Sequence, residues 1–73
     1  MDNIKLGKYL HYKGKFYEVI GIAKHSETLA DFVVYETLYN NPKSKIWVRP
    51  IDDFVGEKEI GGKKVKRFRF ISK

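Results

Sequence analysis

Short runs of aromatic and β-branched residues alternate with turn-forming residues along the whole chain. Such runs suit a pleated, half-buried surface, whereas an amphipathic helix needs apolar residues three and four positions apart. The alternation is strictest in the Arg-Phe-Arg-Phe sequence at residues 67–70, where both phenylalanines should face the interior and both arginines the solvent. The pattern therefore predicts a mostly-β protein built from several short strands.

Turn-forming residues divide the chain into the expected strands. A glycine inside a strand weakens it, so Gly21 should mark a bulge or bend. Pro50 cannot donate to a ladder and should end a strand, and Pro50 and Gly56 bracket one short helical turn over residues 51–55. The Gly61-Gly62 pair suits a two-residue primed turn. We expect strands at residues 9–13, 16–24, 31–39 and 45–49, and then a hairpin that pairs 57–60 with 63–70.

One segment, residues 26–39, fits two structures. Leu29, Phe32 and Val33 have the spacing of one helix face, and Ser26 could cap such a helix. The Phe-Val-Val-Tyr sequence at residues 32–35 is poor helix material and good strand material. We favour a short turn over residues 28–30 followed by a strand, and the helix is the alternative.

The length and the apolar content of the chain allow one small core. A chain of 73 residues buries only about 60% of the surface that it exposes when unfolded. Eleven aromatic residues compensate, because large rings bury much area each. We expect residues 1–73 to form a single domain, with residues 1–7 as a flexible N-terminal tail. The favoured fold is a small, partly open, five-stranded barrel of the SH3-like type with one short helical turn.

Positive charge is concentrated at the C-terminal end. The chain carries a net charge of +6, and residues 57–73 hold seven basic and two acidic side chains. A concentrated positive field attracts polyanions, nucleic acid first, and Lys64, Arg67 and Arg69 are the candidate nucleic-acid-binding residues. Lysines on edge strands also protect sheets from aggregation, and a charge tally does not separate these two explanations.

Several classes of protein are excluded by the composition. The absence of cysteine excludes disulfides and thiolate sites, and two histidines are too few for a structural zinc site. Gly61-Gly62 lacks the lysine-hydroxyl sequence and the following helix of a phosphate loop, and no third ligand accompanies His11 and His25, so we expect no cofactor and no metal. No apolar run is long enough to cross a bilayer, and the first residues are unlike a signal peptide. We expect a cytoplasmic monomer that makes no contact with membranes.

A polar turn and several rings are the candidate binding residues. His25, Ser26, Glu27 and Thr28 concentrate four hydrogen-bonding side chains between two apolar strands, although such a turn can also serve only its own backbone. Trp47 suits the core, but together with Arg49 it could form a stacking and cation-π platform. Arginine can grip carboxylate or phosphate with two donors. We expect a site where the polar turn, residues 25–28, meets Tyr12, Tyr35, Trp47 and Arg49.

A series of short motifs resembles one known family. The motifs are His-Tyr-Lys-Gly-Lys at residues 11–15, His-Ser-Glu-Thr at 25–28, Val-Val-Tyr at 33–35, Trp-Val-Arg-Pro at 47–50 and Arg-Phe-Arg at 67–69. In this order they resemble the uncharacterised bacterial family called domain of unknown function 1653, over about residues 7–71. A proline often precedes the Arg-Phe-Arg sequence in that family, whereas this chain has Lys66. The resemblance implies a small β-rich bacterial domain and no settled activity.

The favoured function is a non-catalytic binding module. RNA or single-stranded DNA is the first candidate partner, because the excess of positive charge suits a phosphate backbone. A protein segment that binds the tyrosine and tryptophan surface is the alternative. The least favoured alternative is a small hydrolase-like enzyme that uses His25 with Glu27 or His11, because neighbouring residues on a strand point to opposite faces and seldom form a relay.

Overall fold

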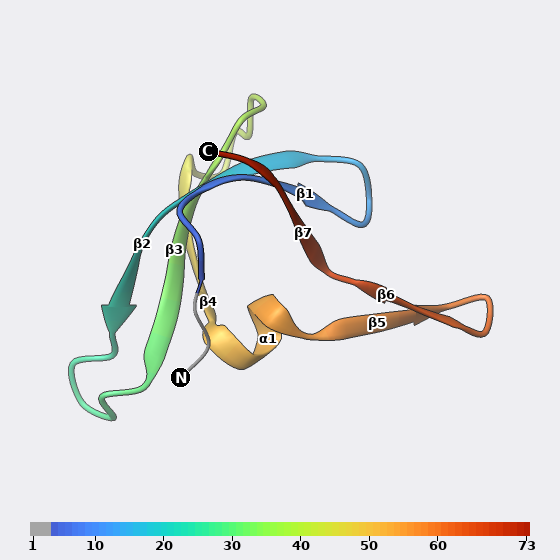
Figure 1. Cartoon of the computed structure of the whole chain (residues 1–73). Helices are drawn as coiled ribbons and strands as arrows, with labels where there is room; N and C mark the ends of the chain where they lie inside the picture. Colours follow the sequence, from blue (N-terminus) through green and yellow to red (C-terminus); the bar gives the residue numbers. More distant parts are fainter. Residues whose placement is uncertain (1–3) are drawn as a thin grey trace.

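Five strands form one antiparallel sheet, and two further strands form a separate ribbon that projects from it. The structure is a computed structural model that describes residues 4–73. The strand order in the sheet is β4-β3-β2-β1-β7, and β5 pairs only with β6. Figure 1 shows the curved sheet, the short helix beneath it and the projecting ribbon. The elements are β1 (Gly7–His11), β2 (Phe16–Lys24), β3 (Asp31–Thr37), β4 (Ile46–Pro50), α1 (Ile51–Val55), β5 (Glu57–Ile60), β6 (Lys63–Lys66) and β7 (Phe68–Ser72).

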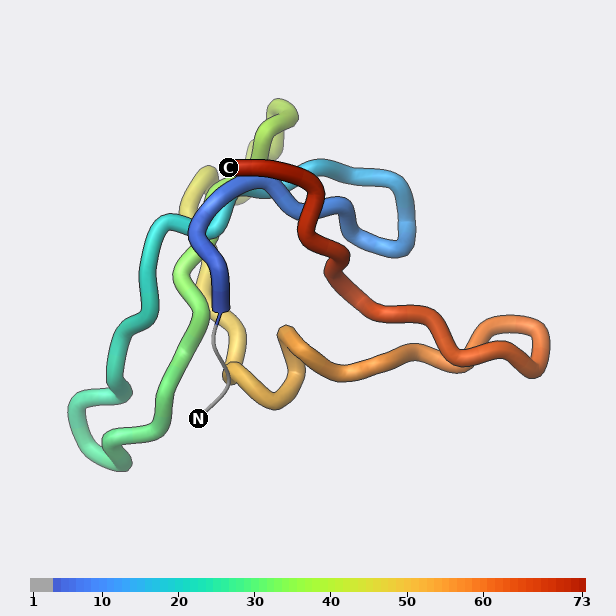
Figure 2. Tube along the Cα trace, in the orientation of Figure 1, coloured from blue at the N-terminus to red at the C-terminus, as the bar shows by residue number. Residues whose placement is uncertain are grey.

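The predicted fold class is confirmed. The protein is mostly β with one short helix, and its five-stranded antiparallel sheet is not closed into a barrel, because β4 and β7 remain the two edges. The trace in Figure 2 shows how the sheet curves around α1 without closing on itself. The strand alternative for residues 26–39 is also confirmed, since β3 occupies Asp31–Thr37 and the residues before it form a turn.

Local signals in the sequence placed most element boundaries well, and the main differences lie in the first strand, in the last strand and in the third, which ends at Thr37 instead of residue 39. The first strand begins at Gly7 instead of residue 9, because β1 pairs with both β2 and β7 and the ladder extends toward the N-terminus. The predicted strand over residues 63–70 is interrupted at Arg67, where the chain leaves the ribbon and joins the sheet. The first three residues of the predicted flexible tail lie outside the described part of the chain, and Ile4 packs against the core.

Two glycine signals correspond to the expected backbone features. The register between β2 and β3 shifts between Val19 and Gly21, which is the predicted bulge. Gly61 and Gly62 have φ of 59° and 82°, the left-handed values that a primed hairpin turn requires. The turn therefore closes β5 and β6 into a tight ribbon.

The core lies on the concave side of the sheet and consists mainly of rings. Phe54 of α1 is 2% exposed and fills the space between the helix and the sheet. Pro50 precedes α1 and Gly56 follows it, so the helix is a single short element that delivers this one ring. The buried apolar side chains are Tyr9, Val19, Val33, Tyr35, Phe54 and Phe68.

Residues 4–73 include neither a membrane-spanning helix nor a cluster of side chains that could hold a metal ion. Within residues 4–73, no helix has the length and apolar character needed to span a membrane. Within the same residues, no three histidine, aspartate or glutamate side chains lie together as a metal site would require.

Candidate functional site

An open cleft lies on the inner side of β2, β3 and β4, toward the end of the sheet where β2 begins and β3 ends. Its volume is about 200 Å³. Tyr35 and Trp47 are cross-strand partners in β3 and β4, so strand pairing places their side chains next to each other. We call this site the aromatic cleft, and its lining residues are Tyr17, Tyr35, Tyr39, Asn41, Trp47 and Arg49.

Arg49 is the one charged side chain among those lining residues, and its charge is not neutralised. Its guanidinium lies 5.6 Å from the ring centre of Phe68, a cation-π contact. Its Nε atom is buried and has no hydrogen-bond partner among residues 4–73. No carboxylate in this part of the chain lies within salt-bridge distance of it. An unpaired buried donor costs about 1–3 kcal/mol, so an acceptor that reached Arg49 would remove this cost.

Two tyrosines next to Arg49 hold each other through their hydroxyls. The oxygens of Tyr17 and Tyr39 are 2.9 Å apart, and Asn41 donates to the Tyr39 oxygen at 3.4 Å. Burial, followed by the hydrogen bond and proximity to Tyr39, raises the pKa of Tyr17 well above its ordinary value of 10.0. The Tyr17 phenol therefore keeps its proton at neutral pH and presents no negative charge to a ligand of Arg49.

His11 does not line the cleft but packs against the aromatic rings of Tyr17 and Phe68. Its ring centre is 4.8 Å from that of Phe68 and 6.0 Å from that of Tyr17. Burial, then the positive charges of Arg49, Lys13 and Arg67, lower the pKa of His11 below its ordinary value of 6.5. The imidazole is therefore neutral at pH 7. Its Nδ1 accepts a hydrogen bond from the backbone N–H of Lys13, which assigns the proton to Nε2.

Trp47 serves the core and the cleft together. Its ring is half-buried, packs against the core and lines the cleft. Its Nε1 donates to the carbonyl of Ser44 at 3.1 Å, so the indole orientation is fixed from the loop before β4. The Trp47 ring therefore contacts the core, as one interpretation of the sequence expected. It also lines a cleft, as the recognition surface of the other interpretation would require.

The polar turn at residues 25–28 lies elsewhere. The backbone N–H groups of Glu27 and Thr28 both donate to Nδ1 of His25, and all four side chains of the turn are exposed. The turn joins β2 to β3 beyond the pair Lys24 and Asp31, whereas the cleft lies near the opposite end, where Tyr17 pairs with Thr37. Because each strand residue adds about 3.3 Å, the hairpin separates the turn from Tyr35 and Trp47. Arg49 pairs with Val33, two residues from Asp31, and its side chain lines the cleft, whereas no residue of the turn does.

Tyr12 is also separated from the cleft and lines a second cavity. Its ring centre lies 4.5 Å from that of His11, with the two planes tilted by 36°, beside the turn between β1 and β2. Opposite lies the β5–β6 ribbon, and the cavity between them has a volume of about 530 Å³. We call it the basic groove, and its lining residues are Leu10, His11, Tyr12, Gly14, Ile60, Lys63, Val65, Lys66 and Arg69.

The three candidate nucleic-acid-binding residues occupy different places. Arg69 lines the basic groove. Lys64 pairs across the ribbon with Glu59 and so lies on the ribbon face that carries acidic side chains. Arg67 is half-buried, and its side chain lies near Gly56. The three residues therefore do not form one continuous row.

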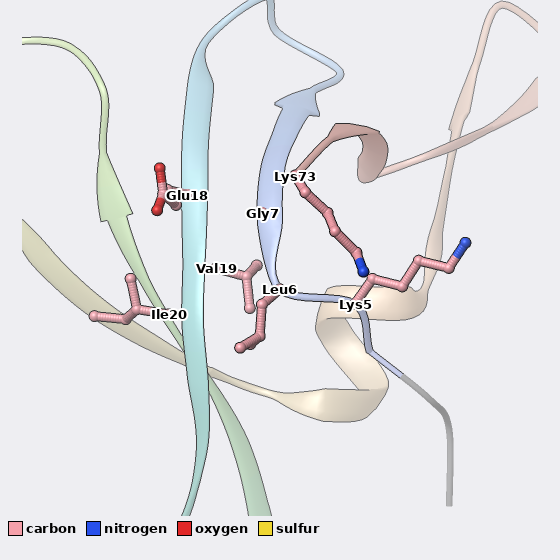
Figure 3. A pocket seen from close by; sticks show the side chains of 7 residues that line it. All are labelled: Lys5, Leu6, Gly7, Glu18, Val19, Ile20 and Lys73. Atoms are coloured by element: carbon pink, nitrogen blue, oxygen red, sulfur yellow. The ribbon is translucent and has the colours of Figure 1, made fainter.

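A third cavity, shown in Figure 3, is larger than the aromatic cleft but brings fewer polar groups together. It has a volume of about 580 Å³ and lies beside β1 and β2. Figure 3 shows Glu18 and Ile20 on one side of β2, with Lys5 and Lys73 beyond β1. Because its charged groups point apart, this cavity offers no convergent set of donors or acceptors.

Strand alternation could have identified more of the cleft than we predicted. Tyr17 alternates with Glu18 and shares the inner face with Val19, so its inward position was readable. Tyr39 and Asn41 follow the end of β3 and carry no comparable signal. Only the pairing of β3 with β2 and β4 brings them beside Trp47.

Fold and site together define a small mostly-β domain with an open antiparallel sheet and a basic, ring-lined cleft. The family described as protein of unknown function (DUF1653) matches residues 7–70, and the chain belongs to this family. Its structure is similar to the crystal structure of a family member from Bordetella bronchiseptica, with a TM-score of 0.89 and 29% sequence identity. The likeness covers 94% of this chain and 88% of that one. No curated protein matches this chain.

Proposed function

We propose that this domain is a non-catalytic binding module that holds RNA or single-stranded DNA in the aromatic cleft. In this arrangement Arg49 binds a phosphate and one base lies against the rings of Trp47 and Tyr39. The observation that carries the proposal is the buried, unpartnered Nε of Arg49 within a wall of rings, in a chain of net charge +6. Arginine offers a planar fork of donors that matches phosphate oxygens.

The charges around the cleft favour an anionic ligand. The lining contains no carboxylate, and Lys15 stands at 4.8 Å over the ring of Tyr39, which adds a second cation close to the cleft. A phosphate at Arg49 would therefore meet attraction without a competing negative group. Such binding depends strongly on salt, because cations bound to the phosphates are released.

The rings supply the part of the affinity that does not depend on charge. Stacking of a base on an aromatic side chain contributes about 1–3 kcal/mol and tolerates every base. The cleft, at about 200 Å³, is smaller than an ordinary small-molecule pocket. Its size suits one base or one phosphate of a longer strand and supports a ligand that extends beyond the cleft.

The geometry of the polar turn supports a module without catalysis. Nδ1 of His25 accepts two backbone N–H groups, so this nitrogen is occupied within the turn. The Glu27 backbone, and not its carboxylate, makes the contact with His25. A hydrolase-like role would need these side chains to converge on a substrate.

The experiment uses Trp47, the single tryptophan, as its own reporter. Trp47 fluorescence should change on titration with oligothymidylate or oligouridylate at low salt, and the affinity should fall steeply as salt is added. Arg49→Ala should weaken binding about tenfold or more, and Arg49→Lys should recover only part of the loss. Lys24→Ala is the matched control, because it removes one exposed cation at the far end of the β2–β3 hairpin.

Two results would contradict the proposal. The first is the absence of any oligonucleotide binding at low salt. The second is an equal loss of affinity in Arg49→Ala and Lys24→Ala, since this would mean that only total charge matters. Binding of a carboxylate-bearing peptide at Trp47, with weak dependence on salt and no oligonucleotide binding, would favour the protein-segment alternative instead.

A further inference from the structure

The basic groove plays no part in the function proposed above. It lies between the body of the domain, at the turn after β1, and the projecting β5–β6 ribbon. Leu10 and Arg69 are cross-strand partners in β1 and β7, so both point to the same side of the sheet, and both line the groove. The groove is thus formed by two separate elements that face each other.

The ribbon separates its acidic side chains from the groove. In the β5–β6 register, Glu57 faces Lys66 and Glu59 faces Lys64, which places both carboxylates on one face. Lys58, Ile60, Lys63 and Val65 lie on the other face, and three of these four line the groove. Lys66 also lines the groove, although the register places it opposite Glu57 on the face of the carboxylates. A short charged ribbon could distribute its glutamates in many ways, and this distribution leaves the groove free of negative charge.

Three cations border the groove and none of them is neutralised. The cations are Lys63, Lys66 and Arg69. The salt bridges found within residues 4–73 involve other lysines. By charge complementarity, the occupant of the groove carries negative charge.

The apolar surface of the groove distinguishes between two kinds of anion. Leu10, Ile60 and Val65 are aliphatic, and Ile60 is 47% exposed. Nucleic-acid bases bind single-strand sites by stacking on rings, and the one tyrosine among the residues that line the groove already contacts the tilted ring of His11, with ring centres 4.5 Å apart. Aliphatic side chains of a peptide can pack on this surface, so acidic peptide fits it better than nucleic acid.

A bound chain would stabilise the β5–β6 ribbon. Figure 2 shows that it projects from the rest of the trace, and β5 and β6 form a sheet of only two strands. An isolated two-stranded hairpin is marginally stable in water. Within residues 4–73, β6 has a partner strand along one edge only, so its other edge can accept backbone contacts from an extended chain.

We propose that the basic groove binds an extended protein segment in which acidic and aliphatic residues alternate. Successive side chains of an extended chain point to opposite sides, so the aliphatic residues can pack on Leu10 and Val65 while the carboxylates reach Lys63 and Arg69. This binding site is separate from the aromatic cleft and does not depend on the function proposed for it.

The test is an amide chemical-shift titration with a short, end-blocked peptide of alternating glutamate and valine. The expected shifts lie at residues 10–14 and 60–69, with little change at Trp47. Lys63→Glu should weaken binding about tenfold or more, because it replaces an attraction in the groove with a repulsion. Lys64→Glu is the matched control, since it makes the same charge change on the opposite face of the ribbon, and it should change the affinity less than about threefold.

The outcomes that overturn this inference differ from those that overturn the nucleic-acid proposal. Absence of shifts with the peptide, equal loss in Lys63→Glu and Lys64→Glu, or equal binding of a lysine–valine peptide would each overturn it. Oligothymidylate that shifts residues 60–69 and displaces the peptide would assign the groove to nucleic acid and overturn it too. Failure of oligonucleotides at Trp47, with peptide binding intact, would contradict only the nucleic-acid proposal.

Discussion

Phe54 of α1 stacks on Phe68 of β7, with ring centres 4.1 Å apart and planes only 9° from parallel. This contact joins the short helix to the last strand across the concave side of the sheet. Phe68 also lies beneath the guanidinium of Arg49 and beside the ring of His11. The pair therefore stabilises the core and at the same time supports the floor of the aromatic cleft.

Removal of the Phe54 ring should therefore be costly. Phe54→Ala should lower the free energy of unfolding by about 3–5 kcal/mol, the range for large rings deleted from cores. Urea unfolding followed by Trp47 fluorescence would measure the loss. Val55→Ala, on the same helix turn at a position that is 40% exposed, is the control and should cost far less. Similar losses in both variants would mean that the Phe54–Phe68 contact is not a centre of the fold.

The environment of His11 predicts a dependence of stability on pH. Burial and nearby positive charges lower the pKa of His11 in the folded protein below 6.5, so the unfolded chain binds this proton first. The contribution of His11 to stability is therefore complete above pH 6.5. It declines as pH falls from there toward the lowered pKa, and is constant below that value.

The measurement is the urea midpoint of the wild-type protein and of His11→Gln between about pH 5 and pH 8. The wild-type midpoint should fall on the acid side, and the variant should fall less over the same range. If both curves have the same slope, another group is responsible for the acid sensitivity, and the environment assigned to His11 is wrong.

The sequence predicted correctly the secondary-structure elements that depend only on neighbouring residues. The second strand, residues 16–24, and the helical turn, residues 51–55, have the predicted bounds because alternation and the Pro50 and Gly56 boundaries act within a few residues. The bulge at Gly21 and the turn at Gly61-Gly62 follow from glycine chemistry in the same way. These features needed no knowledge of the rest of the chain.

The composition of the cleft depended on contacts between distant segments. Tyr35, Trp47 and Arg49 were predicted to lie together and do so, because β3 and β4 are adjacent in the sheet. The polar turn was expected beside them, but none of its residues lines the cleft, and the β2–β3 hairpin separates it from Tyr35 and Trp47. The Nε atom of Arg49 has no hydrogen-bond partner because no other segment within residues 4–73 brings an acceptor near it. No sequence pattern predicts such an absence.

The hydrogen bond between Tyr17 and Tyr39 leads to a prediction for alkaline conditions. Tyr17→Phe should lower the free energy of unfolding at neutral pH by about 0.5–1.5 kcal/mol, the usual net value of such a bond. Because the folded protein raises the pKa of Tyr17 above 10.0, the folded state holds this proton more tightly. The stabilisation is therefore present below pH 10 and is lost as pH rises beyond it.

Tyrosinate absorbance during an alkaline titration would measure this effect. In the wild-type protein, Tyr17 and also Tyr9, whose pKa burial likewise raises, should ionise above the ordinary pKa of 10.0. In Tyr17→Phe, the step that belongs to Tyr17 should disappear and that of Tyr9 should remain. Tyr12→Phe is the control, since the Tyr12 ring lies outside the cleft, and it should leave both steps in place. Persistence of both steps in Tyr17→Phe would assign the step given to Tyr17 to another tyrosine.

Gly7 and Gly14 provide a matched pair for the close contact between β1 and β7. Both have positive φ, 137° and 93°, so alanine is strained at either position. A Cβ at Gly7 would also lie 2.5 Å from the Ser72 carbonyl oxygen, whereas nothing lies within 4 Å of one at Gly14. Gly7→Ala should therefore destabilise the protein more than Gly14→Ala by about 1–3 kcal/mol, the usual cost of steric overpacking. Hydrogen exchange should localise the extra loss to the β1–β7 ladder, and equal losses in the two variants would show that the C-terminal strand yields to the added methyl group without cost.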